Sequence, residues 1–168
     1  MRAYLDIETT YSGTISVIGI YRHDRGTIQL INGGIYDLTL YDALEGISTI
    51  VTFNGSSFDL PTIKRQLNID LKAEFDHRDL LYECRRRGLH GGLKGVEDRL
   101  GITRASAGLS GRDAPQLWAR YEQYGDHTAL QTLLTYNRDD VVNLAVLEAH
   151  LDALPLPTAN PARKVIIE

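Results

Sequence analysis

The order of the β-patterned and helical segments is the feature that most restricts the fold of this chain. Residues 2–9 (RAYLDIET), 14–21 and 27–32 are rich in apolar and β-branched residues, which predicts three consecutive strands. The turn-forming residues 23–26 separate the second strand from the third, so the three strands are expected to form a meander. A fourth β-branched run at 48–53 follows a polar connection.

The second half of the chain is predicted to be mainly helical. Its apolar residues recur at helical spacing, and glycines stand at the expected helix ends. A helix is also expected to start near Phe58, with a serine of the preceding turn as its cap, and Asp126 is placed to cap the last helix. Strands followed by helices predict an α/β fold, with a mixed five-stranded sheet flanked by helices. The elements expected in this half are a short strand at 73–77 and helices at 79–87, 93–100, 115–124 and 127–154.

The composition fits a single globular domain. The chain has 168 residues, of which 43% are hydrophobic and 24% charged, so it can bury a core and is unlike disordered or fibrous sequences. Three of the five prolines fall between residues 154 and 161. We therefore expect one folded domain over residues 1–153 and an irregular tail over residues 154–168.

Composition also limits the compartment and the partners. No apolar run approaches the roughly 20 residues of a membrane helix, and no secretory signal is recognisable, so we expect a cytoplasmic protein without a membrane partner. Cys84 is the only cysteine, which excludes an internal disulfide and fits a reducing compartment. A net charge of -4 argues against nucleic-acid binding through bulk positive charge, although bound divalent cations would make a carboxylate-lined cleft locally positive.

Two acidic residues of the first predicted strand are candidates for metal binding. Asp6 and Glu8 are two positions apart, so their side chains leave the same face of the strand and their oxygens can converge on one cation. Two buried like charges side by side are costly unless a cation neutralises them. The alternative is a solvent-facing strand side on which the two acids alternate with Leu5 and Ile7.

A third candidate acid is expected at the start of a helix. Asp59 follows the fourth predicted strand, near its carboxyl end, where ligands gather in open α/β sheets. In the alternative interpretation, Asp59 only complements the helix dipole.

Tyr136 and Asp140 complete the set of candidate residues. They are four residues apart in the last predicted helix and therefore share one face. Asp139 points about 100° away, and we expect Arg138 and Asp139 to be exposed helix residues. Taken alone, the Tyr136–Asp140 spacing is more typical of a hydrogen bond on a helix surface.

Three short motifs together resemble those of a known nuclease superfamily. Asp-Ile-Glu-Thr at 6–9, Asn-Gly-Ser-Ser-Phe-Asp-Leu-Pro at 54–61 and Tyr-Asn-Arg-Asp-Asp at 136–140 resemble, in this order, the motifs of the DEDD (DnaQ-like) 3′–5′ exonucleases. The final Tyr-x-x-x-Asp is similar to the tyrosine subtype. The histidine subtype is not matched, because Thr135 stands where its histidine would be.

The resemblance extends over almost the whole chain. Further similarity at 92–97 and 125–144 points to a branch of ribonuclease H-like exonuclease domains, and the similarity covers about residues 3–150. It implies a ribonuclease H-like fold and a 3′–5′ exonuclease that acts on single-stranded DNA or RNA with two Mg2+ or Mn2+ ions. The implied metal ligands are Asp6, Glu8, Asp59 and Asp140; the water-positioning residue is Tyr136; and the implied substrate contacts are Thr9, Asn54, Phe58 and Lys94.

Other functions remain open at this point. They are a catalytically weak nucleic-acid-binding module, a structure-selective endonuclease of the same fold and an unrelated phosphoesterase for small molecules. Lys94 also belongs to an arginine-rich segment at 85–112, which either guides the strand or forms a solvated face. The sequence identifies no protein partner and does not distinguish DNA from RNA.

Overall fold

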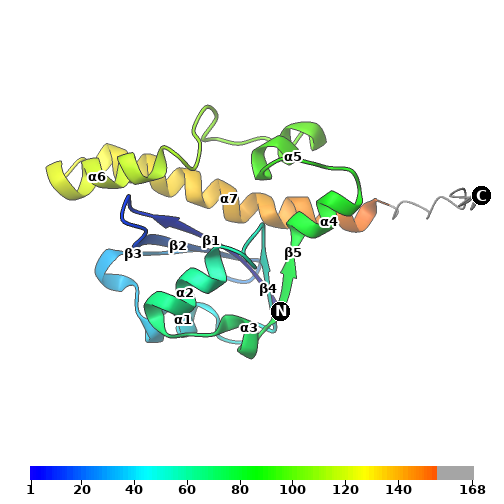
Figure 1. The fold of residues 1–168 in the computed structure, drawn as a ribbon, viewed down its shortest axis with the longest axis horizontal. Helices are drawn as coiled ribbons and strands as arrows, with labels where there is room; N and C mark the ends of the chain where they lie inside the picture. Colours follow the sequence, from blue (N-terminus) through cyan, green and yellow to red (C-terminus); the bar gives the residue numbers. More distant parts are fainter. Residues whose placement is uncertain (155–168) are drawn as a thin grey trace, which may run out of the picture.

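The computed structural model describes residues 1–154, which form a mixed five-stranded sheet with helices on both faces (Figure 1). The strand order is β3-β2-β1-β4-β5. β1 pairs with β2, and β2 with β3, in antiparallel fashion, whereas β1–β4 and β4–β5 are parallel. The strands are β1 (Arg2–Thr9), β2 (Ile15–Arg22), β3 (Gly26–Ile31), β4 (Thr49–Thr52) and β5 (Asp76–Asp79). All but Leu154 of the expected irregular tail lies outside the described residues.

Seven α-helices and one short 3-10 helix accompany the sheet within residues 1–154. None of these helices is both long enough and apolar enough to cross a membrane. The 3-10 helix covers Asn32–Gly34. The α-helices are α1 (Asp37–Ala43), α2 (Asp59–Leu67), α3 (Leu71–Glu74), α4 (Leu80–Arg86), α5 (Leu93–Leu100), α6 (Ala114–Tyr124) and α7 (His127–Ala153).

Three local predictions were wrong. The connection after β3 contains helix α1, which the polar sequence did not indicate. The last strand lies at Asp76–Asp79 instead of 73–77, because parallel pairing with β4 selects these polar residues and the preceding Leu71–Glu74 is a turn of helix. Helix α2 begins at Asp59 without a serine cap, since Phe58 occupies the cap position.

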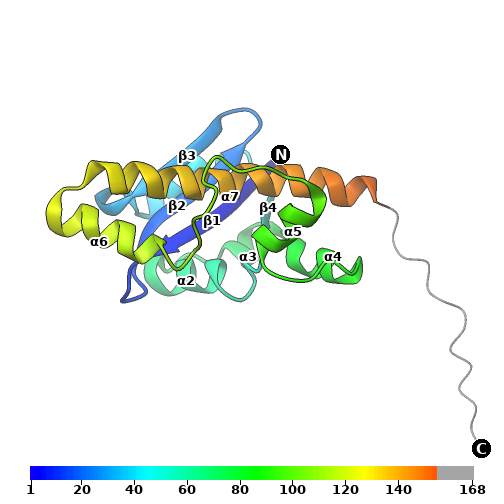
Figure 2. The same ribbon diagram turned by 90° about the horizontal axis from the view of Figure 1, so that it is seen from above.

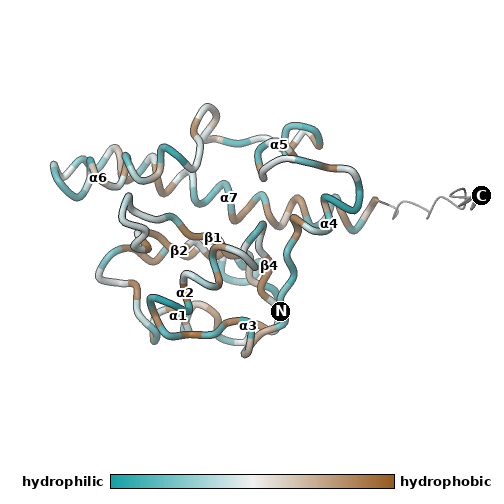
Figure 3. The backbone as a smooth tube through the Cα atoms, in the orientation of Figure 1, coloured by the Kyte–Doolittle hydropathy of each residue, from teal (hydrophilic) through white to brown (hydrophobic). Residues whose placement is uncertain are grey.

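The two faces of β1 carry different chemistry. Ala3, Leu5 and Ile7 pack into the core that the sheet forms with α1 and α2. The alternate residues Tyr4, Asp6 and Glu8 leave the opposite face, which is covered by α7 (Figures 1 and 2). The apolar segments of the strands lie between the two helical layers (Figure 3).

Helix α7 is tied to the sheet at its carboxyl-terminal part. The hydroxyl of Tyr4 donates a hydrogen bond of 2.7 Å to the buried Glu148 carboxylate, and Arg78 of β5 donates one of 2.6 Å to the same group. These contacts fix the helix against β1 and β5. Residues one to three turns earlier on α7 are thereby held over the carboxyl-terminal half of β1.

Candidate metal centre

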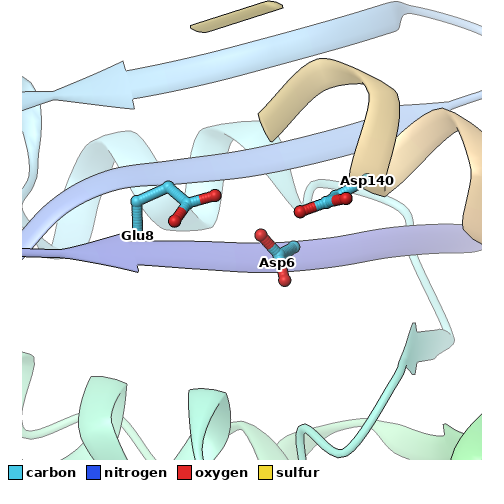
Figure 4. A group of neighbouring side chains, drawn as sticks. All are labelled: Asp6, Glu8 and Asp140. Atoms are coloured by element: carbon cyan, nitrogen blue, oxygen red, sulfur yellow. The ribbon is translucent and has the colours of Figure 1, made fainter. Parts of the chain in front are cut away.

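Three carboxylates from two elements converge at the centre of the sheet. Asp6 and Glu8 leave β1 on one face, and Asp140 comes down from α7 toward them (Figure 4). One oxygen from each of the three side chains lies within 4.8 Å of the others. Glu8 and Asp140 are buried, which excludes the solvent-facing alternative for this strand side.

The neighbours of Asp140 on α7 are buried as well. Tyr136 is 7% exposed and lies on the same face, so the Tyr136–Asp140 spacing is not a surface pair. Asp139 is also buried and accepts a hydrogen bond of 2.7 Å from the backbone N–H of Ser106, so the prediction that it is exposed was wrong. The reason is that the loop between α5 and α6 crosses this side of α7 (Figure 2). Arg138 is exposed as predicted.

Asp59 lies at the edge of the same site. Its Oδ1 accepts a hydrogen bond of 3.0 Å from the backbone N–H of Ile7, in β1, and its side chain is 4% exposed. Within residues 1–154 the tight three-carboxylate group does not include Asp59. Asp59 therefore joins the first turn of α2 to β1.

A pocket of about 230 Å3 brings most of the predicted site residues together. We call it the metal pocket. Lys94 does not line it, but its Nζ lies 4.7 Å from the ring centroid of Tyr136. The metal pocket is lined by Asp6, Ile7, Glu8, Thr9, Phe53, Asn54, Phe58, Asp59, Gly111, Tyr136 and Asp140.

Burial and mutual repulsion raise the pKa values of these carboxyl groups. For Asp6 and Glu8 the pKa lies well above its usual range because the groups are desolvated and face the other acids. Burial raises the pKa of Asp59 to about 7. It raises the pKa of Asp140 to about 6, against the opposing effect of the Arg104 guanidinium. The site therefore disfavours full ionisation of its four acids unless a positive charge compensates them.

The donor set fits a divalent cation. Carboxylate oxygens are the ligands that Mg2+ and Mn2+ prefer. Glu8 Oε1 is buried and has no hydrogen-bond partner, as expected of an atom reserved for a ligand. Asp6, Glu8 and Asp140 can therefore hold a cation.

An amide network orients Asp6 and was not recognised from the sequence. Asn137 Nδ2 donates to Asp6 Oδ2 over 3.1 Å, and Asn137 Oδ1 accepts from Gln29 over 3.0 Å. Gly19 provides the space for this amide, because a Cβ at position 19 would lie 2.1 Å from Asn137 Oδ1. The sequence feature that could have indicated this close approach is the glycine inside the apolar run of β2.

Arg104 holds Asp140 from the other side. Its guanidinium contacts the Asp140 carboxylate and donates a hydrogen bond of 2.9 Å to the buried Glu97. The Arg104 side chain is 8% exposed, so it is not part of a solvated basic face. Arg85, Arg86, Arg99 and Arg112 of the same arginine-rich segment are exposed.

The turn that carries Asn54 is held by Asp79. The carboxylate of Asp79 accepts hydrogen bonds from the backbone N–H groups of Asn54, at 2.7 Å, and Ser56, at 3.0 Å. It also caps α4 by accepting from the Leu81 N–H. Asn54 is held at a φ of 64°, a left-handed conformation on the rim of the metal pocket.

The comparisons with known proteins agree with this architecture. Residues 3–152 match the sequence model of the RNase H superfamily. The chain belongs to this superfamily. The RNase H-like fold predicted from the sequence is thereby confirmed, with its mixed five-stranded sheet and flanking helices.

The chain is similar to parts of two longer proteins. It is 31% identical over 170 residues to the uncharacterized protein YprB of Bacillus subtilis (strain 168), with 88% of this chain and 41% of YprB aligned. Its fold is similar to part of the family B DNA polymerase from the hyperthermophilic archaeon Pyrobaculum calidifontis, with a TM-score of 0.66 and 16% identity. That similarity covers 89% of this chain and 24% of the polymerase. The chain thus spans less than half of either protein.

Proposed function

We propose that this protein is a metal-dependent 3′–5′ exonuclease of the DEDD superfamily, tyrosine subtype, that acts on single-stranded DNA or RNA. The observation that carries the proposal is the convergence of Asp6, Glu8 and Asp140 in one pocket with Asp59 and Tyr136. Membership of the RNase H superfamily supports a nuclease. The proposed 3′–5′ direction of degradation and the tyrosine subtype are based on the resemblance of the three sequence motifs, in their order, to those of the DEDD superfamily.

The four acids are proposed to hold two Mg2+ or Mn2+ ions. We assign Asp6 to both ions, Glu8 and Asp140 to one of them, and Asp59 to the other. Ions bound there would supply an activated water and neutralise the charge that develops on the phosphate. The raised pKa values of the acids mean that these side chains give up protons when a cation binds.

Tyr136 is proposed to orient the attacking water. Burial and the surrounding acids raise the pKa of its hydroxyl, so it stays protonated at neutral pH and cannot act as the base. A protonated hydroxyl on the wall of the pocket can donate a hydrogen bond to a water or to a phosphate oxygen.

The substrate end is proposed to enter beside Phe58. Phe58 is 47% exposed on the rim of the metal pocket, where its ring can stack on a base, while Thr9 and Asn54 offer polar atoms nearby. We propose a cytoplasmic location, because a reducing compartment suits the free, buried thiol of Cys84.

The test compares linear and circular single strands of DNA and RNA with Mg2+, Mn2+ or a chelator. An exonuclease degrades the linear strands and leaves the circles intact, whereas an endonuclease cuts both. Asp140→Asn serves as the inactive control. No cleavage of any strand with either metal would contradict the proposed function and favour a binding module.

A further inference from the structure

A second pocket adjoins the metal pocket. It has a volume of about 560 Å3 and is lined by residues of α5 and of the loop that leads to α6. We call it the basic pocket. Such a volume falls within the usual range of small-molecule sites.

Three hydrogen-bond donors on its lining residues have no partner. They are Lys94 Nζ, Arg104 Nη1 and Ser106 Oγ, and all three are buried. They make up half of the six buried side-chain polar atoms without a partner among residues 1–154. Buried polar groups in folded proteins are almost always paired, so a cluster of unpaired donors indicates a missing acceptor.

Two of the three unpaired donors belong to cationic side chains. Arg104 has its Nε and Nη2 bound to Glu97 and Asp140, which leaves Nη1 free. Lys94 Nζ has the ring of Tyr136 as a neighbour but no acceptor. Asp98, which also lines the pocket, is exposed, and Asp113, which acts electrostatically on Lys94, is bound to Ser110.

Tyr136 and Arg104 connect the two pockets. The Tyr136 ring lines the metal pocket and lies 4.7 Å from Lys94 Nζ and 5.7 Å from the Arg104 guanidinium carbon. Arg104 also contacts Asp140. A ligand held by Lys94 and Arg104 would therefore lie next to the metal centre.

We propose that the basic pocket is a phosphate-binding site in which Lys94, Arg104 and Ser106 hold a nucleotide phosphate other than the one that is cleaved. Ile102 and Leu109 supply apolar surface for the attached sugar or base. The three donor atoms are buried, so binding requires the long Lys94 side chain to rotate and bring its amine to the ligand. The assignment to a nucleotide rests on the proposed function, whereas phosphate binding itself does not.

Calorimetry in the presence of a chelator tests this site without cleavage. The probes are a nucleoside 5′-monophosphate, the matching nucleoside, and short single strands with or without one neutral methylphosphonate linkage. Binding of the monophosphate, but not the nucleoside, would identify a free nucleotide as the ligand. Loss of strand affinity on placing the neutral linkage at one particular position would identify the strand backbone. Either result supports the site.

Variants show where the phosphate binds. Lys94→Met should weaken binding by about tenfold and Ser106→Ala by about threefold, whereas Lys94→Arg should restore most of the affinity. Arg99→Met is the matched control, because Arg99 is exposed on the same helix and does not line the pocket. Equal affinity for ligands with and without the phosphate, or an unchanged affinity in Lys94→Met, would overturn the proposal. Such a result would not contradict the proposed nuclease function, which is tested separately by cleavage with the metal-loaded protein.

Discussion

The side chain of Asn137 donates a hydrogen bond of 3.1 Å to the carboxylate of Asp6, and so a residue of α7 orients a candidate metal ligand of β1. The same amide is fixed by Gln29 of β3. The centre is therefore held by three elements, and its geometry depends on residues that would not touch the metal.

Asn137→Ala should lower the affinity for Mn2+ by roughly 10- to 100-fold, because partners of this kind orient the ligand and tune its basicity. Calorimetric titration with Mn2+ measures the effect without substrate. Gln131→Ala, on the exposed face of the same helix, is the control. An unchanged Mn2+ affinity in Asn137→Ala would show that Asp6 needs no support from α7.

Gly19→Ala should have the same effect on metal affinity and also destabilise the fold. The new Cβ would overlap the Asn137 amide, which must move away from Asp6. Overpacking of this kind costs about 1 to 3 kcal/mol, measurable by urea denaturation. If Gly19→Ala kept both full stability and full Mn2+ affinity, the close approach between β2 and α7 would be disproved.

Asp59→Asn should stabilise the metal-free protein at pH 8. The folded protein binds the Asp59 proton more tightly than the unfolded chain does, because the pKa rises from 3.8 to about 7. Ionisation of the buried Asp59 carboxyl group therefore does not lower the free energy of unfolding below about pH 4. It lowers this free energy increasingly as the pH rises toward about 7. Replacing the carboxylate should add on the order of 4 kcal/mol at pH 8 and little at pH 4.

Thermal denaturation in chelator checks this pH dependence, with Asp76→Asn, an exposed acid, as the control. A Tm of Asp59→Asn below that of wild type at pH 8, with the two converging at pH 4, would mean that the Asp59 carboxylate stabilises the empty site.

Substitutions of the neighbouring residues Asp139 and Asp140 should have clearly different effects on turnover in a nuclease assay. Asp140→Asn should reduce turnover by more than the roughly 10- to 100-fold typical of an outer partner, because it removes a metal ligand. Asp139→Asn should keep turnover near wild type and cost about 1 kcal/mol of stability, through the weakened bond to the Ser106 N–H. If Asp139→Asn instead lost more turnover than Asp140→Asn, Asp139 would be the metal ligand and our assignment would be wrong.

Tyr136→Phe should slow turnover by roughly 10- to 100-fold, because the water loses its orienting hydroxyl. Affinity for Mn2+ should not change, since the tyrosine is not a ligand. Steady-state kinetics and calorimetry on the same preparation separate the two effects. A large loss of Mn2+ affinity would instead make Tyr136 part of the metal-binding framework.

Local periodicity accounts for the parts of the site that could be predicted. Alternation along β1 places Asp6 and Glu8 on one face, and the helical repeat places Tyr136 and Asp140 together, so the shared faces follow from spacing, whereas the resemblance of the three motifs singled these residues out. The burial of Asp139 and the contact of Arg104 with Asp140 depend on the path of the loop between α5 and α6. That path is set by tertiary packing, which no repeat in the sequence encodes.

The most direct test of the central claim follows a 5′-labelled single strand over time with Mn2+, for wild type and Asp140→Asn. We expect a ladder of products that shorten progressively from the 3′ end, absent with chelator and in the variant. A ladder that persists in Asp140→Asn or with chelator, or release of the label as a mononucleotide at the earliest times, would contradict it.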